Sequence, residues 1–424
     1  MKIRRDTLLH FKVLDIIRIL QCALLVCALF LVEGTISYAK EEAEQKEIST
    51  PGTLYAQSAV LMDGSSGRVL YEKNGAKFMA NASTTKILTG ILALENGDLA
   101  DVVKVSSYAA SMPDVQLHIK EGEHYYLGDL LYSLMLESHN DVAVAIAEHI
   151  SGSQEEFSEL MNRKAKEIGC KNTIFLTPNG LDATRQTSGE EVAHGTTAED
   201  LALIMRYCVK LSPQKEQFLQ ITGTAYHTFQ NVEGTRNFFC RNHNAFLNMM
   251  EGAISGKTGF TNKAGYCYVG ALEDDGRCYI VALLACGWPG NKNYKWSDCR
   301  KLMDYGLKEY RLVLLDELEP SYINELTMFV ENGKRTQINQ KAEIELIRQK
   351  GQITEVLLKD DEEIKAEVSK AKLEAPVEEM QKAGVITYYI EDKKWREELL
   401  ICKEKVEKTD YKWCLEQIVG KILY

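Results

Sequence analysis

Two distant parts of this chain carry its strongest strand patterns, and helical patterns lie between them. Residues 56–62 and 68–71 are apolar stretches separated by a turn rich in glycine and serine. Residues 264–272 and 279–286 flank an Asp-Asp-Gly turn and are typical of an antiparallel hairpin. Strands at both ends of one segment favour a single sheet that early and late strands share. We therefore expect an α/β (α+β) domain with helices packed on an antiparallel sheet.

Helical patterns fill the interval between the two groups of strands. Residues 127–136, 141–150 and 155–168 are apolar at helical spacing, and Gly169 ends the third segment. The Thr-Ala-Glu-Asp sequence at 197–200 is a capping box, which predicts the start of a further helix.

Ser83 and Lys86 stand at the head of another helical pattern. The apolar segment 87–94 follows them, and Gly97 ends it. On a helix, residues three apart share one face. A serine hydroxyl at a helix N-terminus has backbone N–H groups and the positive end of the dipole nearby. A lysine on the same face can take the serine proton if its amine is neutral, so the pair is a candidate nucleophile and base.

The Ser-x-x-Lys pattern by itself is weak, because about one or two copies are expected by chance in a chain this long. Copies also begin at Ser212 and Ser369. Pro213 and its polar surroundings predict a loop for the first, and the second lies in a charged, solvated run.

Two further motifs distinguish Ser83 from these copies. Ser-His-Asn at 138–140 lies between two predicted helices, on a connection that can project into a cleft. Lys-Thr-Gly at 257–259 occurs once and directly precedes the hairpin, as an edge strand beside a site would. Ser-x-x-Lys, Ser-x-Asn and Lys-Thr-Gly together are the signature of penicillin-binding proteins and class A β-lactamases.

The chain resembles the low-molecular-mass penicillin-binding proteins, which are serine-type D-alanyl-D-alanine carboxypeptidases of the bacterial cell wall. The similarity covers about residues 54–312 and includes the sequences at 177–182, 197–202 and 256–261. It implies a catalytic domain of the serine β-lactamase/transpeptidase type. His139 departs from the small residue usual in the family, could narrow the cleft, and bears on fine specificity.

The resemblance implies a catalytic role for each motif residue. Ser83 would attack the carbonyl between the two terminal D-alanines and form an acyl-enzyme, with release of D-alanine. Lys86 would be the base, because burial and the neighbouring charge of Lys257 would lower its pKa. Ser138 would relay a proton to the leaving amine, and Asn140 would hold the substrate amide or Lys86. Helix capping and a solvated edge lysine are the structural alternative for these polar residues.

The remaining expected contacts bind the substrate. The backbone N–H groups of the nucleophile and of Phe260 would form the oxyanion hole. Lys257, Thr258 and Gly259 would face the terminal carboxylate, with Arg241 as a further helper. The expected ligand is a peptidoglycan stem peptide ending in D-Ala-D-Ala, and β-lactams are expected covalent inhibitors. No cofactor or metal is expected.

Other polar residues and the overall charge exclude several classes of function. His194, His243 and Glu137 lack metal-ligand spacing, and we interpret them as structural or solvated. The net charge of −11 argues against nucleic acid as a partner. No Gly-x-Ser-x-Gly elbow or P-loop is present, so neither an α/β-hydrolase nor a nucleotide-binding protein is supported.

The N-terminal region predicts export. Residues 1–39 have a basic start, an apolar segment at 19–32 and small residues before a cleavage point after Ala39, which is typical of a signal peptide. An uncleaved anchor is the alternative. A linker at 40–53 follows. We expect the protein at the extracellular face of the cytoplasmic membrane and in the cell wall.

Cysteine usage indicates neither a disulfide framework nor a zinc site. Eleven cysteines occur, two of them in the predicted signal peptide, and the odd remainder has no Cys-x-x-Cys spacing. We expect most of them to be small buried hydrophobic residues.

Short alternating segments separated by glycine turns predict a small all-β domain at 313–400. Its Ala-Pro-Val sequence at 375–377 weakly resembles the family's C-terminal β domain. The domain would hold the catalytic part away from the membrane, although carbohydrate or protein binding is also possible.

The last segment, 401–424, contains an amphipathic pattern between 411 and 424. Its apolar side comprises Trp413, Leu415, Ile418, Val419, Ile422 and Leu423. Such a helix is marginal alone in water, so it needs the β domain or a lipid surface as a neighbour. The family resemblance favours peripheral attachment to the membrane.

Two other functions share these motifs. A class A-like β-lactamase needs a water-activating glutamate between the second and third motifs, and the sequence at 177–182 offers no convincing equivalent. In a non-catalytic penicillin sensor or scaffold the motifs would be free to decay, yet all three are intact. We therefore expect the carboxypeptidase.

Overall fold

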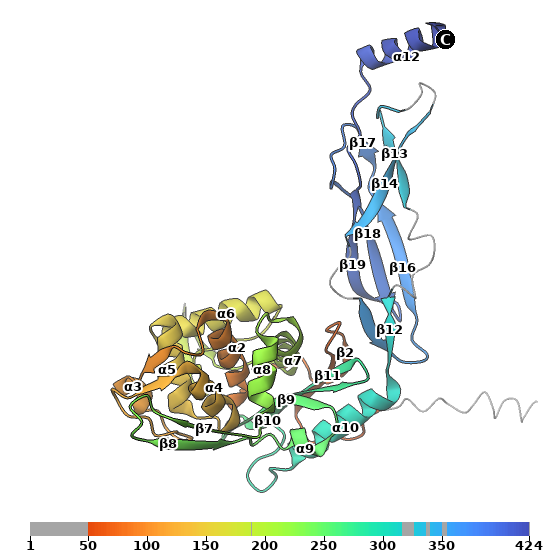
Figure 1. Ribbon diagram of the computed structural model, residues 1–424. Coiled ribbons are helices and arrows are strands. Elements are labelled where there is room, and N and C mark those ends of the chain that lie inside the picture. Colours follow the sequence, from red (N-terminus) through yellow and green to blue (C-terminus); the bar gives the residue numbers. More distant parts are fainter. Residues whose placement is uncertain (1–49, 188, 316–325, 336–339, 350–353, 424) are drawn as a thin grey trace, which may run out of the picture. The chain divides into compact units, whose positions relative to one another are not determined.

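The computed structural model in Figure 1 describes most of the chain. The described residues are 50–187, 189–315, 326–335, 340–349 and 354–423. The predicted signal peptide lies outside them, as does the linker before residue 50. Residues Pro51–Tyr424 form one compact unit.

A five-stranded antiparallel sheet carries the first part of this unit, in the order β2-β1-β11-β10-β9. The strands are β1 (Ser58–Asp63), β2 (Val69–Lys73), β9 (Ala253–Thr261), β10 (Gly265–Asp274) and β11 (Arg277–Leu284). In the β1–β11 pair, Ser58 lies opposite Leu284 and Asp63 lies opposite Tyr279. Early and late strands therefore share one sheet, which confirms the prediction from sequence.

Helices occupy the interval between these strands. They are η1 (Ala82–Thr85), α2 (Lys86–Asn96), α3 (Ser107–Ala110), α4 (Leu127–Leu136), α5 (Asn140–Ser151), α6 (Gln154–Ile168), α7 (Ala198–Arg206), η2 (Tyr207–Leu211), α8 (Lys215–Gly223) and α9 (Phe246–Met249). Helix α10 (Tyr294–Glu309) follows the sheet. Thr197 caps α7, since its side chain accepts a hydrogen bond from the Asp200 N–H at 3.0 Å. The Asp200 carboxylate accepts from the backbone N–H groups of Lys171 and Asn172, so only the Thr197 half of the predicted capping box is formed.

Three two-stranded antiparallel sheets accompany the helices. They pair β3 (Val102–Lys104) with β4 (His124–Tyr126), β5 (Thr184–Thr187) with β6 (Glu190–Ala193), and β7 (Tyr226–Gln230) with β8 (Asn237–Arg241).

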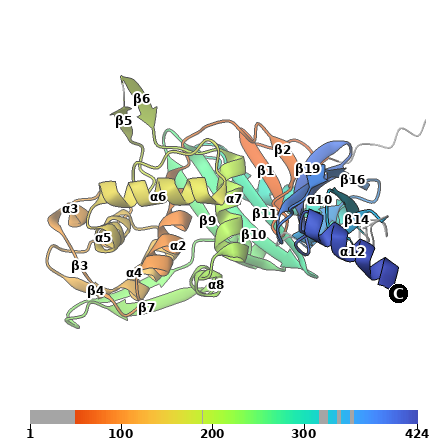
Figure 2. The ribbon, with the colours of Figure 1, turned by 90° about the horizontal axis from the view of Figure 1, so that it is seen from above.

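The sheet has an apolar core on each face. Because successive side chains of a strand point to opposite faces, Val60 and Met62 of β1 pack with α2, α5 and α7. Ala59 and Leu61 face the other way and pack with α10. Figure 2 shows α2, α4, α5 and α6 grouped to one side of the sheet. Burial of each large apolar side chain in this way contributes roughly 1.5–3 kcal/mol to the stability of the folded state.

The C-terminal part is built from strands, as its alternating sequence predicted. A six-stranded sheet has the order β16-β18-β19-β14-β13-β17, and β12 pairs with β15. The elements are β12 (Arg311–Leu314), β13 (Thr327–Glu331), β14 (Ala342–Gln349), β15 (Glu355–Leu358), β16 (Ile364–Lys370), β17 (Leu373–Glu374), β18 (Lys382–Ile390) and β19 (Lys393–Cys402). Ile344, Ile386 and Leu400 belong to a separate core there. Helix α12 (Tyr411–Leu423) ends the chain.

The loop before β5 fixes the position of η1. Gly180 has a φ of +82°, which favours glycine. A Cβ atom at this position would lie 2.0 Å from the backbone oxygen of Ala82. A side chain would therefore push this loop away from the turn that carries Ser83.

Gly180→Ala is expected to lower the free energy of unfolding by more than about 1 kcal/mol, because it adds a backbone clash to left-handed strain. Denaturant unfolding of the variant measures this loss. Gly152→Ala is the matched control, since Gly152 has a φ of +85° and no atom within 4 Å of its Cβ position. Equal losses in the two variants would contradict the close packing at Gly180.

Candidate active site

Ser83 and Lys86 meet at the junction of η1 and α2. The Lys86 side chain is fully buried. Its Nζ donates to Ser83 Oγ at 2.8 Å, to Asn140 Oδ1 at 2.8 Å and to the Asn179 backbone oxygen at 2.6 Å. The first turn is a 3-10 helix, yet the spacing still places both side chains together as the sequence predicted.

The surroundings of Lys86 favour its neutral form. Burial is the largest cause of a pKa well below the ordinary lysine value, and the charge of Lys257 lowers the pKa further. Asp141 acts in the opposite direction with a smaller effect. A neutral amine has two N–H donors and one lone pair. In the neutral form Asn140 and Asn179 can accept the two N–H groups, so Nζ no longer donates to Ser83 and its lone pair can accept the Ser83 hydroxyl proton.

The connection between α4 and α5 presents the second motif. Ser138 has a φ of +70° between the end of α4 and the start of α5. Its Oγ accepts a hydrogen bond from Lys257 Nζ at 2.9 Å. Asn140 donates through Nδ2 to the backbone oxygens of Pro113 at 3.1 Å and Asp114 at 3.0 Å. These two bonds orient the amide so that its oxygen faces Lys86.

The third motif lies on β9, which is the edge strand of the sheet. A Cβ at Gly259 would lie 3.0 Å from the Asn81 oxygen and 3.0 Å from the Ser83 nitrogen. Glycine therefore permits β9 to run against η1. Lys257 is buried, and this burial lowers its pKa to about 7. Its Nζ also donates to the Thr258 backbone oxygen at 3.0 Å.

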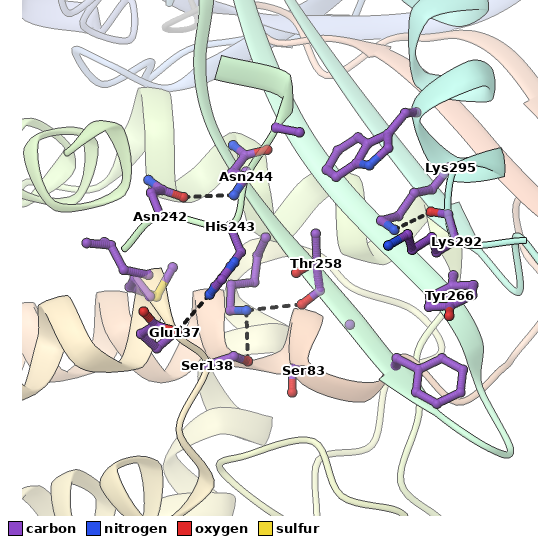
Figure 3. A pocket seen from close by; sticks show the side chains of 18 of the residues that line it. Ser83, Glu137, Ser138, Asn242, His243, Asn244, Thr258, Tyr266, Lys292 and Lys295 are labelled. Atoms are coloured by element: carbon purple, nitrogen blue, oxygen red, sulfur yellow. Dashed lines mark hydrogen bonds and ion pairs between the residues drawn. The ribbon is translucent and has the colours of Figure 1, made fainter. Parts of the chain in front are cut away.

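The three motifs open into one cavity of about 590 Å³ (Figure 3). The predicted site residues that line it are Ser83, Ser138, Lys257, Thr258, Gly259 and Phe260. Lys86 and Asn140 lie behind this lining and reach the cavity through their hydrogen-bond network. The structure thus brings together residues from η1, the α4–α5 connection and β9.

Arg241, which the sequence analysis named as a further carboxylate contact, lies outside the cavity. His243 and Glu137, which it interpreted as structural or solvated, lie in the cavity lining. Arg241 lines a neighbouring hollow of about 630 Å³ and is absent from the lining of the motif cavity. His243 and Glu137 do line that cavity, and His243 Nε2 is 2.7 Å from Glu137 Oε2. The other Glu137 oxygen accepts from the Arg241 N–H at 2.7 Å. Strand β8 ends at Arg241, so no strand periodicity in the sequence pointed to His243.

The other singled-out histidines are buried supports. His194 Nε2 lies 3.0 Å from Thr85 Oγ1, and burial lowers the histidine pKa to about 4. His139 Nδ1 lies 2.7 Å from Ser133 Oγ, and burial lowers its pKa to about 4 as well. His139 is not among the residues that line the cavity, so its departure from the family pattern does not narrow the cleft.

The Ser-x-x-Lys copies that begin at Ser212 and Ser369 have no such surroundings. Ser212 Oγ donates to Glu95 Oε1 at 2.6 Å, and Lys215 contacts Glu216 at 3.9 Å. Ser369 lies within strand β16. The structure also shows free thiols at all the cysteines it describes, and none of the described residues group into a His, Cys, Asp or Glu cluster that could hold a metal.

Sequence comparisons identify both parts of the chain. Residues 43–286 match the D-alanyl-D-alanine carboxypeptidase family. Residues 327–408 match the C-terminal domain of penicillin-binding protein 5. A relative along nearly the whole length is the D-alanyl-D-alanine carboxypeptidase DacF of Bacillus subtilis. It is 29% identical over 409 residues, which cover 94% of this chain and 97% of DacF.

Solved structures share the fold. Penicillin-binding protein 5 from Haemophilus influenzae superposes with a TM-score of 0.66 at 24% identity, covering 85% of this chain and 100% of that protein. Penicillin-binding protein D2 from Listeria monocytogenes in its ampicillin-bound form has a TM-score of 0.51 at 27% identity, covering 61% of this chain and 99% of that protein. With the family match spanning more than half of its residues, the chain belongs to the D-alanyl-D-alanine carboxypeptidase family.

Proposed function

We propose that this protein removes the terminal D-alanine from peptidoglycan stem pentapeptides through an acyl-enzyme on Ser83. The observation that carries the proposal is the buried Lys86 amine 2.8 Å from the Ser83 hydroxyl, at the base of an open cavity. Membership in the carboxypeptidase family supports the same reaction and substrate.

Acylation follows from this geometry. Ser83 Oγ attacks the carbonyl carbon of the penultimate D-alanine while its proton passes to neutral Lys86. The N–H groups of Ser83 and Phe260 stabilise the oxyanion, each donor being worth roughly 2.7–4 kcal/mol in typical cases. The C–N bond then breaks, and the leaving amine takes a proton through Ser138. Water hydrolyses the resulting ester and regenerates Ser83.

Binding of the terminal carboxylate is assigned to Lys257 and Thr258 on β9. With a pKa of about 7, Lys257 in the free enzyme is partly neutral near neutral pH. A bound carboxylate would favour its charged form. His243 replaces Arg241 as the further candidate for this contact, because it lines the cavity whereas Arg241 does not.

Penicillins are expected to acylate Ser83, and the resulting penicilloyl ester is expected to hydrolyse slowly. Among the described residues that line the cavity, Glu137 is the one carboxylate. One of its oxygens accepts a hydrogen bond from the backbone N–H of Arg241, and the other forms a hydrogen bond with His243. It is therefore poorly placed to activate water, which disfavours the β-lactamase alternative. Turnover of peptide would distinguish the enzyme from a non-catalytic sensor.

Location and domain division are part of the proposal. We infer an exported protein with a signal peptide at 1–39, a linker at 40–53, a catalytic domain at 54–312, a β-rich domain at 313–400 and a membrane-associating segment at 401–424. Among the residues that the structure describes, none of the helices is long and apolar enough to cross a membrane. In α12, Leu415, Ile418 and Val419 remain 43–50% exposed. These apolar residues support attachment at the membrane interface.

Ser83→Ala is expected to abolish both covalent labelling by penicillin and release of D-alanine, because it removes the nucleophile. Intact-mass measurement and a D-alanine assay on a D-Ala-D-Ala pentapeptide test this. Ser212→Ala should leave both unchanged. The wild-type penicilloyl adduct should outlast many peptide turnovers, and rapid multiple turnover of penicillin would instead favour a β-lactamase.

The rate of acylation by penicillin should rise with pH and level off well below pH 10.5, the ordinary lysine value. As the pH falls through the lowered pKa of Lys86, the amine is protonated and can no longer act as the base. The acid limb of the pH–rate profile therefore reports the pKa of Lys86. Lys257→Met should move the limb to higher pH, because it removes a positive charge that lowers the Lys86 pKa. Lys171→Met, a change at an exposed lysine, should not move it. A limb in the wild type near pH 10.5 would contradict a neutral Lys86.

Truncation of the mature chain before Tyr411 should abolish binding to lipid vesicles and preserve peptide cleavage, since no motif residue is lost. Each buried large side chain is worth roughly 1.5–3 kcal/mol, so binding of the full chain should resist high salt. Vesicle sedimentation at low and high salt measures the binding and its resistance to salt, and a D-alanine assay measures peptide cleavage. Ile418→Asp should weaken binding, while Glu416→Gln should not. Unchanged sedimentation after truncation would remove α12 as the anchor.

A further inference from the structure

The cavity wall formed by the start of α10 and the residues just before it is positively charged. Figure 3 shows Lys292, Lys295 and Tyr266 grouped on one side of Ser83, with Glu137 and His243 on the other. Glu137, the one carboxylate among the described lining residues, therefore lies away from the two lysines. Neither lysine has an ion-pair partner within the described part of the chain.

Lys295 is fixed in this wall. It is 7% exposed, and its Nζ donates to the Lys292 backbone oxygen at 2.5 Å. The same atom lies 4.7 Å from the ring centre of Tyr266 and 4.8 Å from that of Trp296. Burial is the main cause that lowers the Lys295 pKa, and Lys292 contributes to the same shift. The charge of Lys292 therefore acts on Lys295, and an anion bound beside them would offset this effect.

Lys292 is the accessible member of the pair. It is exposed and lines the cavity two residues before the first residue of α10. Because its backbone oxygen is held by Lys295, the position of its main chain is set by the buried lysine. Its side chain is free to meet a group that enters the cavity.

The register of the sheet gives the direction in which the substrate extends. The proposed carboxylate contact is at Thr258, and the proposed oxyanion contact is at Phe260, further along β9. Phe260 lies opposite Tyr266 on β10, and their ring centres are 4.7 Å apart. A peptide that follows β9 from Thr258 past Phe260 therefore reaches Tyr266 and then the lysines at the start of α10. The residue before D-Ala-D-Ala would lie at this point.

We propose that Lys292, backed by Lys295, forms an anion subsite that selects stem peptides with a carboxylate on the side chain before D-Ala-D-Ala. This subsite rests on the proposed function of the cavity. Its two positive charges attract a carboxylate and repel a side-chain ammonium. Part of the contact is open to solvent, so the preference is of modest size and depends on ionic strength.

Three capped peptides X-D-Ala-D-Ala test the subsite with the full mature chain. X is Nε-succinyl-lysine, which ends in a carboxylate, Nε-acetyl-lysine, which is neutral, or lysine, which is cationic. The expected order of kcat/KM is succinyl, acetyl, lysine, with a step of about three- to tenfold for each change of charge. Higher salt should compress these steps.

Variants assign the preference to the named residue. Lys292→Met should bring the succinyl-to-acetyl ratio close to one, and Lys292→Glu should invert it. Lys308→Met is the matched control on α10, since Lys308 is 80% exposed and is absent from the cavity lining. It should keep the wild-type ratios. Penicillin acylation of each variant reports an intact fold and nucleophile.

Equal kcat/KM for the succinyl and acetyl peptides in the wild type would overturn the subsite, as would a ratio that Lys292→Met leaves unchanged. Either result is compatible with cleavage of all three peptides through Ser83. Failure to release D-alanine from any of them would instead overturn the proposed function, and the subsite with it.

Discussion

The buried amine of Lys86 is the group on which the site depends. An ammonium ion removed from water is costly unless it is well paired, and here its partners are a hydroxyl, an amide oxygen and a backbone oxygen rather than a carboxylate. Loss of the proton relieves this cost and creates a base beside Ser83. The first turn of α5 and the loop at Asn179 thus bind the same atom that we propose as the base.

Strand β9 completes the site because it can approach η1 closely. Gly259 permits that approach, which brings Lys257 near enough to lower the Lys86 pKa. Lys257 is itself buried and has a lowered pKa. The site therefore holds two lysines that resist protonation together, and in the proposed reaction the carboxylate of a substrate would supply the missing negative charge. Substrate binding and the protonation state of the site are coupled in this arrangement.

The cavity has a different character at its two ends, and this difference matters for specificity. The His243–Glu137 pair is internally compensated by its 2.7 Å contact, whereas the lysines at the start of α10 lack an acidic neighbour in the lining. The leaving side of the peptide would lie at the first end, where Lys257 and Thr258 are the proposed contacts of the terminal carboxylate. The other end can discriminate between peptides by the charge of an upstream side chain.

The sequence by itself determined the shared sheet, the helices between its strands, and the pairing of Ser83 with Lys86. These follow from local periodicity and from residues three apart on one turn. It also identified Ser138 and Lys257 as motif residues, although their 2.9 Å contact depends on packing. Tertiary structure alone decided that His243 and not Arg241 lines the cavity, that His139 turns into the core, and that Lys292 lines the same cavity as Ser83. These three placements depend on where strands and helices end and on how distant segments pack. Neither of these two factors leaves a periodic signal in the sequence.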